Sequence, residues 1–442
     1  MVMSTSARLI RLFRSAELAY AVVTLFALTQ GPVYRVWSES NSHLDILPNP
    51  SPQHVYFATF VAVQLPAVVL WSRRANIDWF RDRANQVLIA LLGWLGLSVV
   101  WSTFARHAMP DYVALALTTC FGWYLAASFS RREFWWVVAS AMALGVAISW
   151  FSIMRLWDGA VNLQEDYWIG IYGNRNSLAP VTAMAIIAAF GVLLSSPRVC
   201  TRRFGLESVL TVLFVAALVF FATIELWNSS SQTSPSALAV AFLACLGWLV
   251  VRRVMIGLRL PAGVRSLSAP LVLAVSAVVL FFALRIVGGV GGVVTETRAF
   301  NQRSGLWTLS WQGFLEKPWL GWGWMAAWND PLFLSSQAGS TWMTWGMQWS
   351  HNAYHDLLLG GGAPAALFFV LYLWFASQAM SPSNPVNVVL RMFLAVFVLA
   401  AATQESFFIG SHFLWALLVA ALAAAVRAPE SVDEEHARQP TT

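Results

Sequence analysis

Long stretches of apolar residues, each about the length needed to cross a lipid bilayer, recur along this 442-residue chain. A helix needs about 20 mostly apolar residues to span the hydrocarbon core, where the backbone must satisfy its hydrogen bonds internally. Hydrophobic residues make up 58% of the sequence and charged residues only 11%. Soluble domains carry about 25% charged residues. The sequence therefore predicts an all-α, polytopic membrane protein.

Twelve stretches have the length and composition of membrane spans. They are residues 16–37, 55–72, 86–104, 111–129, 133–154, 175–195, 206–226, 237–252, 270–294, 353–378, 388–407 and 412–427. Gln30, Gly31 and Pro32 interrupt the first stretch, which has no small-residue cleavage site, so we interpret it as a retained span. We thus expect about 12 transmembrane helices in a single integral membrane domain over residues 1–442.

The distribution of basic residues orients these spans. Twelve spans place both termini on the same side, and cytoplasmic loops carry an excess of Lys and Arg. Most of the 27 basic residues lie at the termini or in loops on their side. The exceptions are Arg35, Arg106, Arg155, Arg175, Arg285, Arg298, Arg303 and Lys317. We therefore expect a plasma (inner) membrane protein with both termini cytoplasmic, and we attribute the net charge of +6 to topology, not to nucleic-acid binding.

The sequence shows no pattern typical of a metal or nucleotide site. The three cysteines, Cys120, Cys200 and Cys245, have no metal-ligand spacing, and we interpret them as packing residues. The chain contains no glycine-rich phosphate loop of the GxxxxGK[ST] type. We expect no metal ion and no cofactor.

One external segment, residues 295–352, is much longer than the other loops and is rich in tryptophan. Its tryptophans are Trp307, Trp311, Trp319, Trp322, Trp324, Trp328, Trp342, Trp345 and Trp349. Disordered segments are poor in aromatic residues, whereas tryptophan favours the membrane interface. Residues 301–316 have the pattern of a short amphipathic helix that ends before Pro318. We expect this helix to lie on the outer membrane surface, although indole rings also line sugar-binding surfaces.

Four arginines lie near the predicted outer ends of helices: Arg175, Arg285, Arg298 and Arg303. Arginine binds phosphate through two parallel hydrogen bonds and stays charged when partly desolvated. The alternative is that such a residue only extends toward the interface or pairs with an acid, which we favour for Arg285. For Arg303, at the head of the tryptophan-rich helix, we favour phosphate binding.

Ser350, His351 and Asn352 stand immediately before the tenth predicted span. His351 closes the external segment that Arg303 opens, and a neutral imidazole accepts a proton at neutral pH. A purely structural histidine is the alternative. His355 is the closer helical neighbour of His351, since residues four apart share a face.

Other polar residues also lie near the predicted outer ends of the spans. Residues 155–176 and 227–236 are polar runs at the mouths of apolar helices, where helix N-termini would favour an anion. Glu225, Glu405 and Asp356 are carboxylates in similar positions. Ionisable residues in a membrane are candidates for function, but each of these three also fits a solvated charge or a partner for arginine.

Three of these motifs together resemble a known signature. The sequence Arg303-Ser-Gly-Leu-Trp307, then Pro318-Trp-Leu-Gly-Trp-Gly323, then Ser350-His-Asn-Ala-Tyr354 resembles that of the O-antigen ligase and O-antigen polymerase superfamily. In that family an arginine opens a short periplasmic helix, Pro-x-x-Gly-x-Gly follows, and Ser-His-Asn-x-Tyr precedes the next span. The run Gly173-Asn-Arg-Asn176 is similar to the family's glycine–asparagine segment. The resemblance covers residues 165–378.

The resemblance implies a membrane glycosyltransferase of the GT-C type. Such enzymes take a glycan from a polyprenyl-diphosphate donor and transfer it to a glycan or lipid acceptor at the periplasmic or exterior face, without a metal. Carried over by position, Arg303 would bind the diphosphate, and His351 would activate the acceptor hydroxyl or assist in the site. The remaining candidates for binding substrate are Arg175, Asn176, Arg285, Arg298, Asn352 and Tyr354.

The sequence departs from the family pattern in two places. The family often has Lys or Arg in the polar segment before its eighth span, whereas this chain has the neutral Gln232 there. The basic diphosphate site of the family is therefore incomplete at this position. The residues that follow Tyr354, which include Gly360, Gly361 and Gly362, match the usual pattern loosely.

Other functions remain open at this point. A ligase joins the glycan to a different acceptor, such as a lipid core, and a polymerase of the same superfamily joins repeat units; the motifs do not separate them, and we favour the ligase. A transporter or flippase of lipid-linked saccharides fits twelve spans equally well. Transporters commonly show related halves and charged relays in the middle of the membrane, which this sequence does not display. A non-catalytic scaffold would leave Arg303 and His351 without a role.

Overall fold

The computed structural model describes residues 5–34, 52–75, 77–155, 157, 159–196, 205–273, 275–276, 298–330, 333, 349–380, 385–403 and 411–423. These residues are almost entirely helical, and the two strands among them, β1 (Val161–Asn162) and β2 (Tyr167–Trp168), form a short antiparallel hairpin. Five helices are long and apolar enough to cross a membrane: α7 (Arg131–Met154), α8 (Arg175–Ser195), α10 (Leu206–Asn228), α11 (Thr233–Gly257) and α16 (Ala353–Gln378). The expected all-α membrane class is confirmed at this level.

The remaining helices fill most of the other predicted stretches. They are α1 (Thr5–Leu28), α3 (Pro52–Ser72), α4 (Ile77–Arg81), α5 (Arg83–Ser98), α6 (Ala105–Ser128), α12 (Ala262–Arg265), α14 (Arg298–Glu316), α17 (Pro385–Ala401) and α18 (Phe413–Ala423), with the 3₁₀ turn Ala327–Asn329. The predicted span 270–294 lies mostly outside the described residues. In place of one stretch over 16–37, α1 ends at Leu28 and Gln30 has a φ of 70°, so the chain turns at the predicted interruption.

Short polar residues begin several of the helices, as helix-capping chemistry requires. Asp82 caps α5, Asn174 caps α8 and Asn352 caps α16, each by accepting a backbone N–H from the first turn. Ser130 and Glu133 form a reciprocal capping box at the start of α7. These caps fix where each helix starts.

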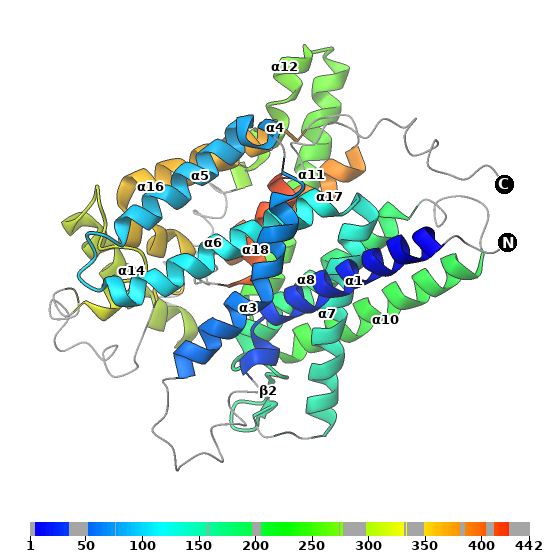
Figure 1. Ribbon diagram of the computed structural model, residues 1–442, viewed down its shortest axis with the longest axis horizontal. Coiled ribbons are helices and arrows are strands. Elements are labelled where there is room, and N and C mark those ends of the chain that lie inside the picture. The colour runs from blue at the N-terminus through cyan, green and yellow to red at the C-terminus, as the bar shows by residue number, and fades with distance from the viewer. Residues whose placement is uncertain are drawn as a thin grey trace.

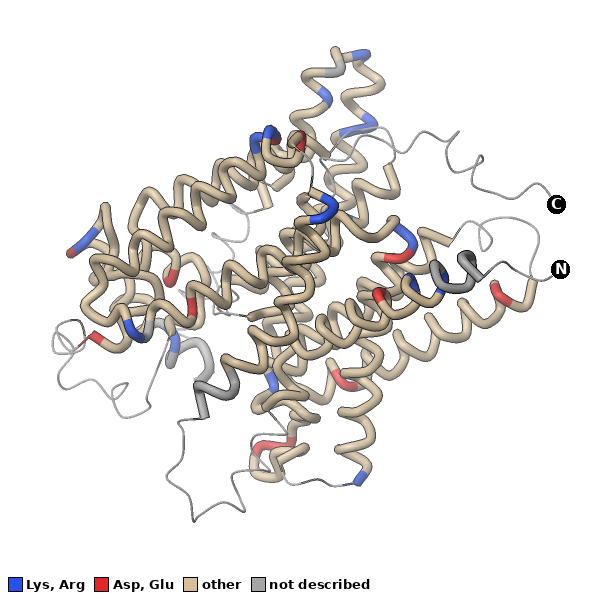
Figure 2. Tube along the Cα trace, viewed as in Figure 1, with Lys and Arg blue, Asp and Glu red and all other residues tan. Residues whose placement is uncertain are grey.

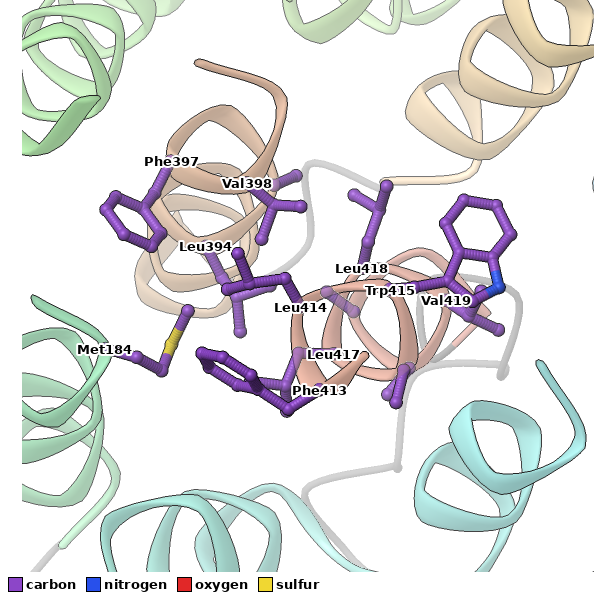
Figure 3. Close-up of a cluster of buried hydrophobic side chains, with 14 of the residues drawn as sticks. Met184, Leu394, Phe397, Val398, Phe413, Leu414, Trp415, Leu417, Leu418 and Val419 are labelled. Atoms are coloured by element: carbon purple, nitrogen blue, oxygen red, sulfur yellow. The ribbon is translucent and has the colours of Figure 1, made fainter. Parts of the chain in front are cut away.

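Helix α18 lies at the centre of the bundle, between α6 and α17 (Figures 1 and 3). All of its residues are buried, as expected for a helix that is entirely apolar and has no polar face to expose. The Trp415 indole donates to the Thr119 hydroxyl at 2.9 Å. A side chain on Gly122 would lie 2.7 Å from the Ala416 carbonyl, so α6 packs closely against α18 only because residue 122 has no side chain.

Most charged residues lie near the ends of the helices (Figure 2). At one end of the bundle, Arg14 of α1 pairs with Glu17 and Glu133, and Arg74, just after α3, pairs with Glu17. The side chain of Arg14 also donates to the Ser128 carbonyl at 3.0 Å. These contacts join four helices, α1, α3, α6 and α7, on the side that the sequence predicts to be cytoplasmic.

Candidate functional site

The turn before α16 is built by the side chains of its own motif. The Asn352 amide oxygen accepts the backbone N–H groups of Tyr354 (3.0 Å) and His355 (3.3 Å), which caps the helix. Asp356 accepts the N–H of Ser350 at 2.9 Å, and the Ser350 hydroxyl donates to the Asn352 carbonyl at 2.8 Å. Ser350, Asn352 and Asp356 are all buried. The turn is thus rigidly defined by three buried side chains.

This turn places His351 in an unusual conformation. His351 has a φ of 54°, in the left-handed region that non-glycine residues seldom adopt, and its side chain is half-buried. The Trp349 indole N–H donates to His351 Nδ1 at 3.2 Å. Since Nδ1 accepts this bond, a neutral imidazole carries its proton on Nε2.

Helix α14 packs along the first half of α16 and runs in the same direction. The rings of Trp307 and His355 have centroids 6.2 Å apart. Two turns later, Gly313 lies so close to Leu359 that a Cβ on Gly313 would be 2.8 Å from the Leu359 Cδ1 atom. The second contact lies further along both helices than the first, so the two helices run parallel here.

The parallel packing places the two principal candidates at the same end of this contact. Arg303 lies one turn before Trp307 on the same face of α14. His351 lies in the turn before α16, so the expected helical i, i+4 relation of His351 to His355 is wrong. The side chains of Arg303 and His351 are both half-buried. Arg303 and His351, nearly fifty positions apart in the sequence, therefore both lie toward the leading end of the α14–α16 pair. The predicted helix over 301–316 is confirmed and starts slightly earlier, at Arg298.

The side chain of Tyr354 contributes to the packing between helices. Its hydroxyl donates to the Leu399 carbonyl of α17 at 2.7 Å, and the N–H of Ala353 donates to the Ala402 carbonyl at 2.9 Å. Ala353 and Tyr354 thus hold the head of α16 against the end of α17. The sequence does not predict that Asp356 accepts the N–H of Ser350, because a spacing of six residues suggests no such bond.

A second polar group surrounds the start of α8. Asn174 caps the helix by accepting the N–H of Ser177 at 3.0 Å, and Arg175 lies over the ring of Tyr167 with its Cζ 4.7 Å from the ring centroid. Asn176 accepts the Ser231 hydroxyl at 3.2 Å, which ties α8 to the turn before α11. The exposed Gln232 follows in that turn, where the family often has a basic residue.

Glu225, near the end of α10, is fully buried, and neither carboxyl oxygen has a hydrogen-bond partner among the described residues. It lies near Tyr172, whose hydroxyl donates to the Thr29 hydroxyl at 3.3 Å. Burial raises the pKa of the Tyr172 phenol, and the nearby Glu225 carboxyl raises it further. This pair was not singled out by any sequence motif.

Helix α17 packs against α8 and α11 and receives the bonds from the head of α16. The contacts among the described residues link α14 with α16 through Trp307 and His355, and link α8 with the turn before α11 through Asn176 and Ser231. Arg285 and Glu405 lie outside the described residues, as does the side chain of Arg298. The described residues contain no group of three or more His, Cys, Asp or Glu that could hold a metal ion.

A scan of this chain against models of protein families finds no match, and no curated protein matches it. The resemblance in the short motifs stays a prediction.

Proposed function

We propose that this protein is a membrane glycosyltransferase that transfers a glycan from a polyprenyl-diphosphate donor to an acceptor hydroxyl at the outer face. In this proposal the chain crosses the membrane about twelve times, has both termini in the cytoplasm and belongs to the GT-C type. The observation that carries the proposal is the parallel packing of α14 on α16, which brings Arg303 and His351 to the same end.

The chemistry divides between these two residues. The acceptor oxygen attacks the anomeric carbon, and the bond from that carbon to the phosphate oxygen breaks, so the electron pair leaves with the diphosphate. Arg303 stabilises the growing negative charge on this leaving group, because a guanidinium binds phosphate oxygens through paired hydrogen bonds. Partial burial strengthens that interaction relative to bulk water.

His351 receives the proton that the acceptor loses. In the structure Nδ1 is occupied by the Trp349 indole N–H. The acceptor hydroxyl therefore replaces the indole as the donor to Nδ1 and passes its proton to the ring as its oxygen attacks. The left-handed backbone at His351 is held by the buried contact between Ser350 and Asp356.

The direct test is transfer by the purified protein in lipid vesicles, supplied with a polyprenyl-diphosphate glycan and candidate acceptors. Free polyprenyl diphosphate and a glycosylated acceptor are the expected products. Glycan chains that grow by repeat units would identify a polymerase, and a single transfer to a different acceptor would identify the ligase that we favour.

The buried Glu225 favours a second candidate, a transporter of lipid-linked saccharides. A buried carboxyl group inside a membrane helix that has no hydrogen-bond partner among the described residues is typical of proton-coupled transport. In that case Glu225→Gln abolishes movement of the lipid between leaflets. Under the glycosyltransferase proposal the same variant keeps its transfer rate within about tenfold of wild type, because Glu225 lies outside the Arg303–His351 pair.

A further inference from the structure

Helix α16 is broken in its interior, a place where backbone groups in a membrane need partners. Gly362 has φ 67° and ψ −169°, a conformation open essentially to glycine alone. Pro364 follows and contributes no N–H to the helix. A helix interrupted in this way leaves carbonyl and N–H groups that the helix itself cannot satisfy.

The segment Pro318–Gly323, here named the clamp segment, supplies those partners. The N–H of Trp322 donates to the Leu359 carbonyl at 2.8 Å, and the N–H of Gly323 donates to the Gly360 carbonyl at 3.1 Å. In return the N–H of Ala363 donates to the Pro318 carbonyl at 2.7 Å. The clamp segment therefore completes the broken turn of α16 with main-chain hydrogen bonds.

The approach between the two backbones is so close that glycine is required on both sides. A Cβ on Gly321, which has a φ of 66°, would lie 2.7 Å from the Gly360 carbonyl carbon and oxygen. A Cβ on Gly362 would lie 2.5 Å from the Trp319 carbonyl oxygen. These neighbours are backbone atoms that cannot turn aside as a side chain would.

The clamp segment is bonded to α14, and Trp324, the residue that follows the segment, is bonded to α5. The Trp322 indole donates to the Gly313 carbonyl of α14 at 2.9 Å. From α5, which runs beside α16 (Figure 1), the Trp94 indole donates to the Gly361 carbonyl at 2.7 Å. The Ser98 hydroxyl of α5 accepts the N–H of Trp324 at 2.9 Å. The broken turn is thus held from α5 and from the clamp segment, which in turn holds α14.

We propose that the clamp segment is a positioning element, which fixes α14 against the first half of α16 and so keeps Arg303 and His351 in register. The proposal rests on the proposed function for its catalytic consequence. In this role Gly321 acts through its backbone, Trp322 acts through its backbone N–H and its indole N–H, and neither touches substrate. A small displacement of α14 along α16 shifts the diphosphate relative to the acceptor, and misplacement of about 1 Å costs about 10²-fold in rate.

The test compares Gly321→Ala with Gly93→Ala in the full-length protein in lipid nanodiscs. Gly93 lies in α5 next to Trp94, and a Cβ there meets no atom within 4 Å. Trp322→Phe is the second variant, because it removes the indole bond to Gly313 and leaves the backbone free to pair. Amide hydrogen exchange is measured over residues 318–324 and 353–363, and kcat and KM are measured with a polyprenyl-diphosphate glycan.

We expect Gly321→Ala to speed exchange at least tenfold in both peptides and to lower kcat at least tenfold with less change in the donor KM, and Gly93→Ala to match wild type. Trp322→Phe shows the same pattern at smaller amplitude and replaces Gly321→Ala if that variant does not fold. Unchanged exchange over 353–363, or faster exchange with an unchanged kcat, overturns the proposal. A wild-type protein without transfer refutes the proposed function, and the exchange measurement alone then decides whether the clamp segment holds α16.

Discussion

The hydrogen bond from Trp349 to His351 leads us to predict different effects of substituting these two residues. His351→Ala removes the group that receives the acceptor proton, so we expect transfer to fall roughly 10²–10⁴-fold. Trp349→Phe removes a donor that the acceptor must displace in any case, so we expect less than about tenfold change, the scale of one hydrogen bond. Initial rates with saturating donor measure both. A loss in Trp349→Phe as large as in His351→Ala contradicts this role for Nδ1.

Arg303 tests the electrostatic half of the site. Arg303→Ala is expected to lower kcat/KM for the donor roughly 10²–10³-fold, as loss of one group that stabilises a developing anion does. Arg303→Lys keeps the charge but loses the paired geometry, so an intermediate value is expected. The control is Arg106→Ala, an exposed arginine at the head of α6. Equal effects in Arg106→Ala and Arg303→Ala would show that general surface charge, not this site, attracts the donor.

At the scale of elements, the helix caps separate stability from function. Asn352→Ala removes the oxygen that accepts two N–H groups, which costs about 1 kcal/mol of stability. Asp82→Ala removes the cap of α5 and should cost a similar amount. Thermal unfolding of the two variants measures this. Only Asn352→Ala is expected to reduce transfer, because its cap orients the turn that carries His351; equal transfer in both variants would refute that link.

The elements that the sequence predicts depend on patterns within short stretches of the chain. The elements that it does not predict depend on contacts between residues far apart in the sequence. The apolar stretches and the helix before Pro318 depend on neighbouring residues, which a sequence displays directly. The break at Gly362 and its pairing with the clamp segment depend on contacts across some forty residues. The glycines at 360–362 match the family pattern only loosely, and the sequence alone does not show that Gly360 pairs with Gly323 or that Gly362 lies against Trp319.

At the scale of the whole molecule, the arginine distribution predicts sidedness. Leu163, in the hairpin before α8, and Leu258, at the end of α11, are both highly exposed and lie on opposite sides of the proposed membrane. In a chain with Cys200→Ser, we expect Leu163→Cys to react with an impermeant maleimide on intact cells, and Leu258→Cys to react only after permeabilisation. The reverse pattern would place Arg303 and His351 in the cytoplasm and exclude an outer-face transferase.

The bundle has an apolar core centred on the buried α18 (Figure 3). The ionisable groups that the proposal uses belong to α14 and to the turn before α16, and the rest of the molecule serves to hold those two elements. Both the enzyme and the transporter interpretations share this scaffold. They differ in whether a covalent bond in the lipid-linked glycan breaks.

That difference is measured most directly with the purified protein in vesicles that contain a radiolabelled polyprenyl-diphosphate glycan. The account predicts that label appears on an added acceptor hydroxyl, that an equal amount of polyprenyl diphosphate is released, and that the His351→Ala protein does neither. Movement of the intact lipid-linked glycan between leaflets, with no release of polyprenyl diphosphate, would contradict it.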